Sequence, residues 1–399
     1  MQRSFDEFGE MRFMVGNAER VQRMQFVKAM RPFSDEALSF LNDLSRLLLK
    51  ADREYSDVAT FAFWCRRAAL IREKEKYDDI SDRLGRGVAF HVAPSNVPVN
   101  FAFSLAAGLL AGNANIVRIP SKDFPQVDII CKAMNHLLTE NAEIAAYIAL
   151  VRYTVSKEIT DALSSISDTR VIWGGDSTIA DIRRSPMKPR ANEITFADRY
   201  SMLLIHADEY LNAQDKDRIA RDFYNDTYFS DQNACTAPRI IFWMGERKEE
   251  AKAEFWKCEY AFVKGKYTLA PVQAVGKLGA LYKVAARRTV RQEKTEDGLI
   301  TRVFVPSVDS TLMEFKYGSG FFFECDIEQF ADMLPACGER CQTLTYYGVR
   351  PEDLWSFVNE FRPRGLDRMV PVGNSMNFSL IWDGCDLIRT MSRKLEVSK

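Results

Sequence analysis

The sequence has few of the residues that usually bind a structural metal. It contains only three histidines, and none of its eight cysteines belongs to a Cys-x-x-Cys pair. Cys337 and Cys341 lie four positions apart, but the nearest histidine, His206, lies far upstream. Zinc sites need four such ligands at short spacings. We therefore expect no metal site and reduced thiols.

Excess charge and long apolar runs are also missing. The 54 basic and 55 acidic side chains nearly cancel, which argues against nucleic acid or an acidic membrane surface as the main partner. No uninterrupted apolar segment is long enough to span a bilayer, and the charged N-terminus does not resemble a signal peptide. The composition, with 47% hydrophobic residues, predicts a globular cytoplasmic protein of two or three domains.

A third absence is the glycine fingerprint of the common dinucleotide-binding fold. A Gly-x-Gly within residues 84–90 precedes a strand-like run instead of following one, so we interpret it as a turn. Even so, residues 87–121 show the pattern strand, helix, strand, which predicts a βαβ unit and a parallel sheet. A helix over 127–149 and a strand within 169–176 extend it. The predicted fold class is α/β, with ligands at the carboxyl ends of the strands.

A second α/β region begins near residue 201, and residues 320–349 again show strand, helix, strand. We expect four parts: a helical segment (1–80) packed on a nucleotide-binding domain (81–200), a catalytic domain (201–372), and a C-terminal segment (373–399). The last segment is expected to return to the cofactor domain or to an oligomer interface.

Four turns at the ends of predicted strands contain residues suited to binding or catalysis. In chain order they hold Asn96; Arg118, Ser121 and Lys122; Gly174 and Gly175; and Cys235. A thiol used in chemistry needs an approachable sulfur and nearby donors, and Cys235 has small and polar neighbours before a strand-like run. Each turn also has a plain structural interpretation: an Asx-turn, a solvated loop, a tight βα turn and a small buried residue.

The order of these turns resembles the aldehyde dehydrogenase superfamily, in which a nucleophilic cysteine follows an oxyanion-binding asparagine by more than a hundred residues. Here the separation, 235 − 96, is 139 residues. That fold binds its dinucleotide without the glycine fingerprint. Three longer segments resemble one branch, the LuxC family of fatty acyl-CoA reductases: "APSNVPVNFAFSLAAGLLAGNANIVRIPSK", "SDQNACTAPR" and "LDRMVPVGNSMNFSLIWDGCDLI". Three long segments in one order make a chance match improbable.

The resemblance implies roles for these residues. Cys235 becomes the nucleophile, and Asn96 with the backbone N–H of Cys235 holds the oxyanion. Arg118, Ser121, Lys122, Gly174 and Gly175 contact the cofactor. Glu314 and Phe315 resemble a Glu-x-Phe segment that holds the nicotinamide ribose, although the intervening residue is missing, and an ordinary strand-end glutamate is the alternative.

One departure from hydrolysing aldehyde dehydrogenases is informative. Those enzymes carry a glutamate that activates water, and if Ser201 marks the register, Phe196 stands at its position. Glu193 lies three residues earlier. Without this base, an acyl group on Cys235 would persist until it meets hydride or another thiol.

The sequence therefore predicts reduction of acyl-CoA, or another acyl thioester, to a fatty aldehyde. The expected cofactor is NADPH, because Ser121 and Lys122 replace a glutamate that would repel the 2′-phosphate. Relatives imply an acyl-protein synthetase or thioesterase partner, and we expect a homo-oligomer. Three alternatives stay open: a CoA-acylating aldehyde dehydrogenase running towards acyl-CoA, a Cys-dependent acyltransferase using His206 as base, and a nonenzymatic assembly subunit.

Overall fold

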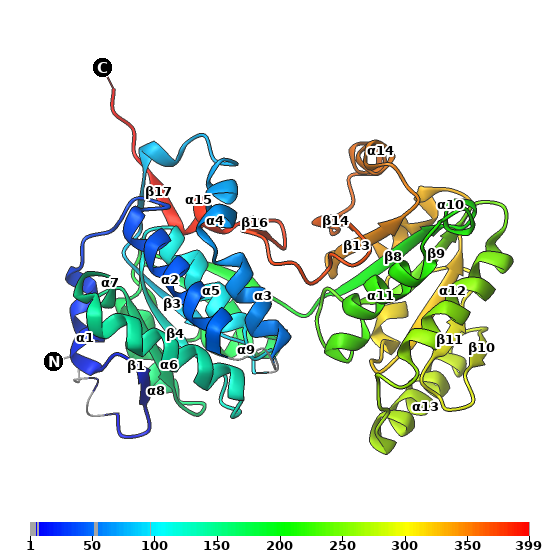
Figure 1. Ribbon diagram of the computed structural model, residues 1–399, viewed down its shortest axis with the longest axis horizontal. Helices are drawn as coiled ribbons and strands as arrows, with labels where there is room; N and C mark the ends of the chain where they lie inside the picture. The colour runs from blue at the N-terminus through cyan, green and yellow to red at the C-terminus, as the bar shows by residue number, and fades with distance from the viewer. Residues whose placement is uncertain (1–4, 6–7, 52–54, 96, 399) are drawn as a thin grey trace. The chain divides into compact units, whose positions relative to one another are not determined.

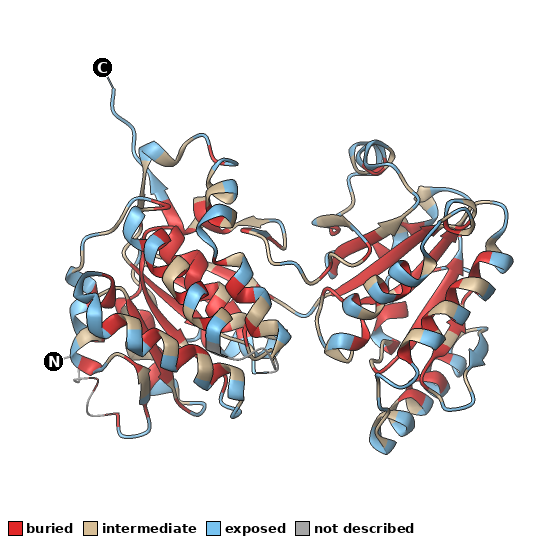
Figure 2. Ribbon diagram, viewed as in Figure 1, coloured by how far each residue is buried: buried red, intermediate tan, exposed pale blue. Residues whose placement is uncertain are grey.

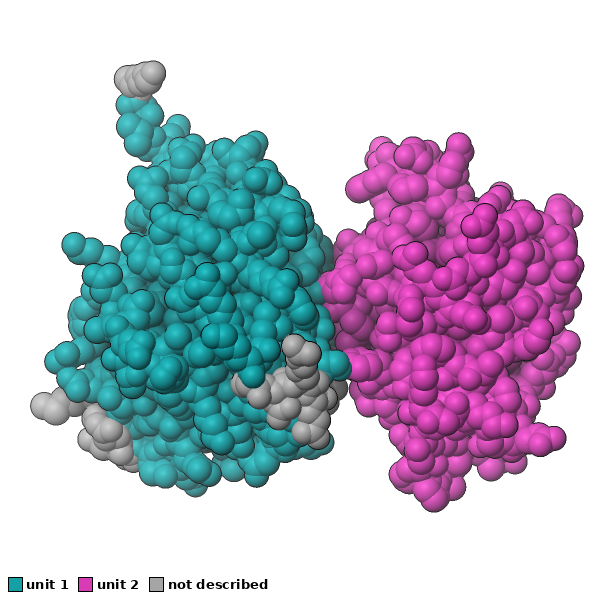
Figure 3. Space-filling model, in the orientation of Figure 1, with its two compact units in different colours: residues 1–197, 378–399 teal, residues 198–377 magenta. Residues whose placement is uncertain are grey.

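The computed structural model describes all residues except 1–4, 6–7, 52–54, 96 and 399 (Figure 1). The chain forms two compact units (Figure 3). Unit 1 comprises residues 1–197 and 378–399, and unit 2 comprises residues 198–377. The expected N-terminal helices and the end of the chain thus both belong to unit 1.

Unit 1 is built on a six-stranded sheet in the order β1-β5-β4-β3-β6-β7. The strands are β1 (Arg12–Val15), β3 (Val88–Val92), β4 (Ala114–Arg118), β5 (Ile148–Arg152), β6 (Thr169–Trp173) and β7 (Asn192–Phe196). Only the pair β1–β5 is antiparallel. The chain runs outward from β3 through β4 and β5, then returns to the other side of β3 for β6 and β7. Ligands of such sheets bind where the strand order reverses, outside the carboxyl ends of the strands.

Helices cover this sheet (Figure 1). They are α1 (Ala18–Arg23), α2 (Asp35–Ala51), α3 (Ser56–Trp64), α4 (Arg67–Lys74), α5 (Asn100–Leu110), α6 (Pro125–Glu140), α7 (Ala142–Ala145), α8 (Lys157–Ile166), α9 (Asp176–Arg183) and α15 (Leu387–Met391). Helix α5 is almost entirely apolar and buried, as expected for a helix enclosed by the sheet and other helices. At Gly108, an added Cβ would lie 1.9 Å from Oδ1 of Asn115, so glycine permits the close approach of α5 to β4.

The predicted long helix over 127–149 is wrong at its C-terminal end. Asn141 leaves the helical conformation and caps α7, accepting a hydrogen bond from the Ile144 N–H at 3.4 Å. Residues from Ile148 onward form strand β5, which the sequence analysis missed because its apolar run continues that of the helix.

Unit 2 contains a seven-stranded sheet in the order β10-β11-β12-β9-β8-β13-β14. The strands are β8 (Tyr200–His206), β9 (Pro238–Met244), β10 (Arg291–Lys294), β11 (Thr301–Phe304), β12 (Phe321–Asp326), β13 (Cys341–Tyr347) and β14 (Arg368–Pro371). Only β10 is antiparallel to its neighbour. The helices are α10 (Ala207–Leu211), α11 (Lys216–Asp226), α12 (Lys248–Val263), α13 (Pro271–Ala285) and α14 (Pro351–Phe361). Short 3-10 helices are η4 (Tyr228–Ser230), η5 (Leu312–Phe315) and η6 (Phe330–Ala336).

The α/β prediction with mainly parallel sheets is confirmed in both units, and the buried residues concentrate on the strands and on the helix faces towards them (Figure 2). The C-terminal segment is tied to unit 1 by strand β17 (Ser392–Lys394), which pairs with β2 (Arg83–Gly85). Within the described part of the chain, no helix is long and apolar enough to cross a membrane. The described residues also contain no cluster of three or more His, Cys, Asp or Glu side chains arranged to hold a metal.

Candidate active site

Cys235 lies in a tight turn that leads into β9, the strand between β12 and β8. The Ala237 N–H donates to the Ala234 carbonyl at 3.1 Å, which closes the turn around Cys235. The Cys235 carbonyl accepts a hydrogen bond of 2.8 Å from the hydroxyl of Ser201 on β8. Cys235 is partly exposed, whereas Cys65, Cys131, Cys325, Cys337 and Cys341 are buried. The turn therefore leaves Cys235 partly exposed while anchoring its backbone to the sheet.

The side chain of Gln232, fully buried three residues before the cysteine, fastens the turn to two strands. Its Oε1 accepts hydrogen bonds from the N–H groups of Gly320 (2.8 Å) and Phe321 (3.3 Å). Its Nε2 donates to the carbonyl of Pro238 at 3.1 Å. One amide group thus connects the cysteine turn to the beginning of β9 and to the beginning of β12.

The backbone before Cys235 adopts an uncommon conformation. Asp231 and Gln232 both have φ near 52°, in the left-handed region that non-glycine residues rarely occupy. The Asp231 carboxylate accepts hydrogen bonds from the Tyr267 hydroxyl and from Nε2 of Gln273, the latter at 2.8 Å. Such strain persists only where surrounding contacts enforce it, and it is concentrated at functional sites.

Arg239 places a cation beside the turn. Its guanidinium donates to the carbonyls of Tyr317, at 2.6 Å, and Gln232. Burial lowers the pKa of Arg239 to about 10, while the charges of Asp198, Asp231 and Cys235 oppose this shift. Arg239 therefore remains charged at neutral pH, and a nearby cation favours the thiolate form of a cysteine.

A second turn, residues 373–377, packs against the cysteine turn. The Asp226 carboxylate accepts from the N–H groups of Gly373 (2.6 Å) and Ser375 (3.0 Å). The hydroxyl of Thr236, next to Cys235, contacts the sulfur of Met376 at 3.2 Å. Burial raises the pKa of Asp226 to about 6 despite these hydrogen bonds. The segment "VPVGNS", noted in the sequence, thus supports the cysteine turn from another part of unit 2.

A catalytic dyad of Cys235 with His206 is wrong for this fold. In the parallel pair β8–β9, Ser201 lies opposite Pro238 and His206 lies opposite Met244. Five residues of parallel strand span about 16 Å. His206 therefore lies at the opposite edge of the sheet from Cys235, which removes the base on which the acyltransferase alternative depended.

Phe196, which the sequence analysis placed at the position of the water-activating glutamate, and nearby Glu193 both have partners within unit 1. Glu193 accepts hydrogen bonds from Arg170 Nε (2.8 Å) and Arg183 Nε (2.7 Å). Phe196 is 5% exposed and stacks on Trp173 with 3.8 Å between ring centroids. A phenyl ring cannot accept a proton, and both carboxylate oxygens of Glu193 already accept hydrogen bonds from arginines.

Residues expected to contact a cofactor lie in turns at the carboxyl ends of β4 and β6. Arg118 ends β4, and its guanidinium lies 4.6 Å from the centre of the Tyr153 ring. Ser121 and Lys122 follow in an exposed turn. Gly174 and Gly175 lie between β6 and α9, and an added Cβ at Gly175 would meet no atom within 4 Å. In the sheet, β3 lies between β4 and β6. The two turns therefore lie on either side of the strand at which the order of the strands reverses.

Two expected cofactor residues lie in unit 2 instead. Glu314 and Phe315 end the short helix η5, where Glu314 is exposed and Phe315 is buried. The following segment contacts the cysteine turn: at Gly318, an added Cβ would lie 2.9 Å from the carbonyl oxygen of Asp231. The predicted oxyanion donor Asn96 lies outside the described residues.

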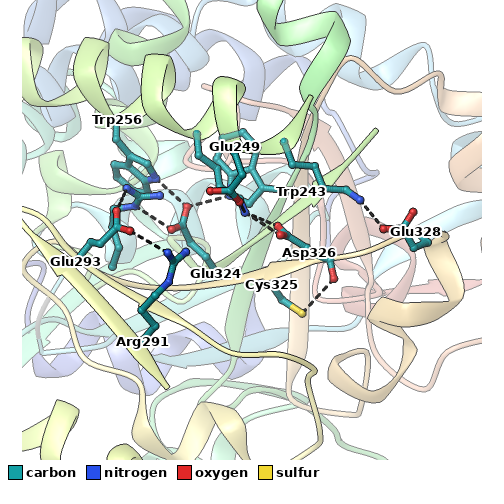
Figure 4. A network of polar contacts seen from close by, with 12 residues as sticks. Trp243, Glu249, Trp256, Arg291, Glu293, Glu324, Cys325, Asp326 and Glu328 are labelled. Carbon is teal, nitrogen blue, oxygen red and sulfur yellow. Dashed lines mark hydrogen bonds and ion pairs between the residues drawn. The ribbon is translucent and has the colours of Figure 1, made fainter. Parts of the chain in front are cut away.

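His91 and Glu324 are buried polar groups with structural partners. The His91 ring shares hydrogen bonds with Ser104 (2.7 Å) and Asn115 (3.0 Å), and burial lowers its pKa to about 4, so it is neutral at pH 7. Glu324 lies at the centre of the network in Figure 4. It accepts from the indole N–H groups of Trp243 (2.9 Å) and Trp256 (2.7 Å) and from the guanidinium of Arg302 (2.8 Å). Both carboxylate oxygens are thereby occupied, which indicates a structural role.

The sequence analysis did not single out Gln232, Arg239 or Asp226. The first two stand within "SDQNACTAPR", so the same segment that pointed to Cys235 contained them. Asp226 had no such signal, because its partners Gly373 and Ser375 lie about 150 residues away along the chain.

The two units, each with a mainly parallel sheet, have an aldehyde dehydrogenase-like fold. Among solved structures, a lactaldehyde dehydrogenase has a TM-score of 0.67 at 12% identity, covering 94% of this chain and 88% of that one. Aldehyde dehydrogenase 21 of Physcomitrella patens has a TM-score of 0.63 at 11% identity, covering 94% and 87%. At such low identity these similarities establish the fold alone.

Residues 17–280 match the family model described as acyl-CoA reductase (LuxC), and the chain belongs to this family. Two curated relatives are long-chain acyl-protein thioester reductases, from Photorhabdus laumondii and Vibrio harveyi. Each is 26% identical, over 173 and 171 residues, which is 42% of this chain. The matched stretch spans only 34% of each relative's length.

Proposed function

We propose that this protein reduces an acyl thioester to an aldehyde through an S-acyl intermediate on Cys235. The observation that carries the proposal is the Cys235 turn, held by buried Gln232 beside the cation of Arg239. Two observations support reduction over hydrolysis: Phe196 stands where hydrolysing relatives carry the water-activating glutamate, and nearby Glu193 is paired with two arginines.

In the proposed reaction the Cys235 thiolate attacks the carbonyl carbon of the thioester. The new C–S bond forms, the carrier leaves as its own thiolate, and the acyl group stays on Cys235. The side-chain amide of Asn96 and the backbone N–H of Cys235 are proposed to hold the transient oxyanion, where one strong donor is worth about 3–4 kcal/mol. After reduction of the carbonyl, the C–S bond breaks, the aldehyde leaves, and the thiolate of Cys235 is restored.

A reduced nicotinamide, when bound, supplies the hydride. The proposed cofactor domain is unit 1, with contacts from Arg118, Ser121, Lys122, Gly174 and Gly175; Glu314 and Phe315 are proposed contacts from unit 2. The open space at Gly175 suits a group that approaches the backbone before α9. We propose NADPH over NADH, since Ser121 and Lys122 are exposed and the neighbouring carboxylate of Asp123 is held by Arg152 at 2.6 Å.

The names of the relatives support long acyl chains carried on a protein as substrates, and the description of the family model supports acyl-CoA. We also propose a partner that supplies the acyl group, an acyl-protein synthetase or thioesterase. We place the reaction in the cytoplasm and propose a homo-oligomer.

Intact-mass spectrometry after mixing with a panel of acyl-CoAs tests the proposal. The parent is expected to gain one acyl mass, and Cys235→Ser is expected to gain none while still binding the nicotinamide. Cys258→Ser is the matched control, because Cys258 is also partly exposed and lies in unit 2. A stable adduct on Cys235→Ser, or its loss in Cys258→Ser, would identify a different nucleophile.

A further inference from the structure

The near-neutral charge of the whole chain conceals one strongly basic segment. Residues 260–292 contain seven lysines and arginines and no aspartate or glutamate. The whole chain has 55 acidic residues in 399, so a segment of this length would on average contain four or five acidic residues. Helix α13 lies in the middle of this segment.

The outer face of α13 is apolar. Val272 is 74% exposed, Val275 70%, Leu278 45% and Tyr282 63%. At 100° per residue these four side chains fall within an arc of about 120° and form one stripe. We call these four residues the α13 stripe. Figure 2 shows the exposed side of this helix.

The opposite face explains why the stripe points outward. On that face, Ala280, Leu281 and Val284 are buried against the rest of unit 2. Lys277 is buried with them, and its ammonium donates to the carbonyls of Gly298 (2.7 Å) and Ser319 (2.8 Å). Because these contacts fix the rotation of the helix, the stripe cannot turn inward without breaking them.

The same segment carries exposed basic side chains before and after the stripe in the sequence. Lys264 and Lys266 precede the helix, and Lys283 and Arg287 lie at its C-terminal end. Arg288 has an acidic partner in Asp309, at 2.7 Å, so it does not belong to this set. Within α13 itself no acidic residue opposes these charges.

The charge of this segment indicates what kind of surface the α13 stripe binds. A second copy of the chain would bring two basic segments together, which like-charge repulsion disfavours. A helix with an exposed apolar stripe, a tyrosine at one end of it and exposed basic residues before and after it has the features of a helix that lies in a membrane interface. We infer that α13 docks this protein on the surface of an anionic lipid bilayer, with the stripe inserted among the acyl chains and the basic residues on the headgroups.

This inference is independent of the proposed reaction, and vesicle binding tests it without substrate. The full chain is sedimented with phosphatidylcholine vesicles and with vesicles of phosphatidylcholine and phosphatidylglycerol. We expect binding to the anionic vesicles alone, weakening as salt is raised. Lys283→Gln with Arg287→Gln should weaken binding and reduce its dependence on salt.

Val272→Glu with Val275→Glu should lower the partition coefficient about tenfold or more, because the stripe would then carry charge. Phe26→Glu with Val155→Glu is the matched control: both side chains are highly exposed, at 83% and 93%, and the charge change is the same. Circular dichroism verifies that each variant is folded, and glutamate suits a helix better than valine.

Failure of the parent to bind anionic vesicles would overturn the inference, as would equal losses in the stripe and control variants. Dimerisation in analytical ultracentrifugation that the stripe variant abolishes would also overturn it, since a second copy would then cover this face.

Discussion

Replacing Gln232 with alanine isolates the contribution of one buried amide to the cysteine turn. The change removes three hydrogen bonds, to the N–H groups of Gly320 and Phe321 and to the carbonyl of Pro238. Each is worth about 1 kcal/mol net, and a buried group left without a partner costs about 1–3 kcal/mol. We expect local opening of the turn to become easier by about 3 kcal/mol, which is roughly a hundredfold in the opening equilibrium.

Hydrogen exchange measured by mass spectrometry reports this opening directly. Peptides covering residues 228–240 and 318–323 should exchange roughly a hundredfold faster in Gln232→Ala. Peptides from unit 1 should be unchanged and serve as the internal control. The acylation rate of Cys235 should fall in the same variant.

Gln232→Gly separates the lost hydrogen bonds from backbone strain. Glycine loses the same amide but adopts the left-handed conformation at φ near 52° without the cost of about 1–2 kcal/mol that other residues incur. Its exchange should therefore lie between those of the parent and Gln232→Ala. Exchange in Gln232→Ala within threefold of the parent would refute the view that this amide holds the turn.

Four further predictions follow from the site and its supports. Asn96→Ala should lower the rate of thioester reduction about 10²–10³-fold at saturating substrate, and a rate within threefold of the parent would leave Asn96 without a catalytic role. Ser121→Glu should shift the ratio of kcat/KM for the two reduced cofactors towards NADH, and an unchanged ratio would contradict the assignment of this turn. Burial raises the pKa of Asp226 in the folded state to about 6. The protonated side chain therefore stabilises the fold fully below about pH 4, and this contribution is lost as the pH rises through 6. Between pH 4 and 6 the urea midpoint of Asp226→Asn should change less than that of the parent. Glu324→Gln should lower the unfolding free energy of unit 2 by about 2 kcal/mol in urea titrations, and no change would show that the network in Figure 4 is energetically neutral.

Short-range sequence patterns predicted several of the strands and the turns that follow them, although they missed β5. The alternation of strand-like and helix-like runs was enough to predict the α/β fold class, because the spacing of apolar residues in each element reflects which of its faces is buried. The apolar run that begins in α6 continues into β5, so the apolar pattern alone could not place the boundary between helix and strand. The structure places the end of the long helix at Asn141, which leaves the helical conformation.

The sequence alone predicted that Cys235 precedes a strand among small and polar residues and, if Ser201 marks the register, that Phe196 stands where hydrolysing relatives have a glutamate. The tertiary structure decided what those residues contact. It separated His206 from Cys235 by the length of β8, engaged Glu193 with two arginines, and brought Gly373 to Asp226. It also decided that the stripe of α13 faces outward. Local patterns record the burial and conformation of neighbouring residues, whereas the pairing of distant side chains depends on strand order and register, which emerge only when the whole sheet is assembled.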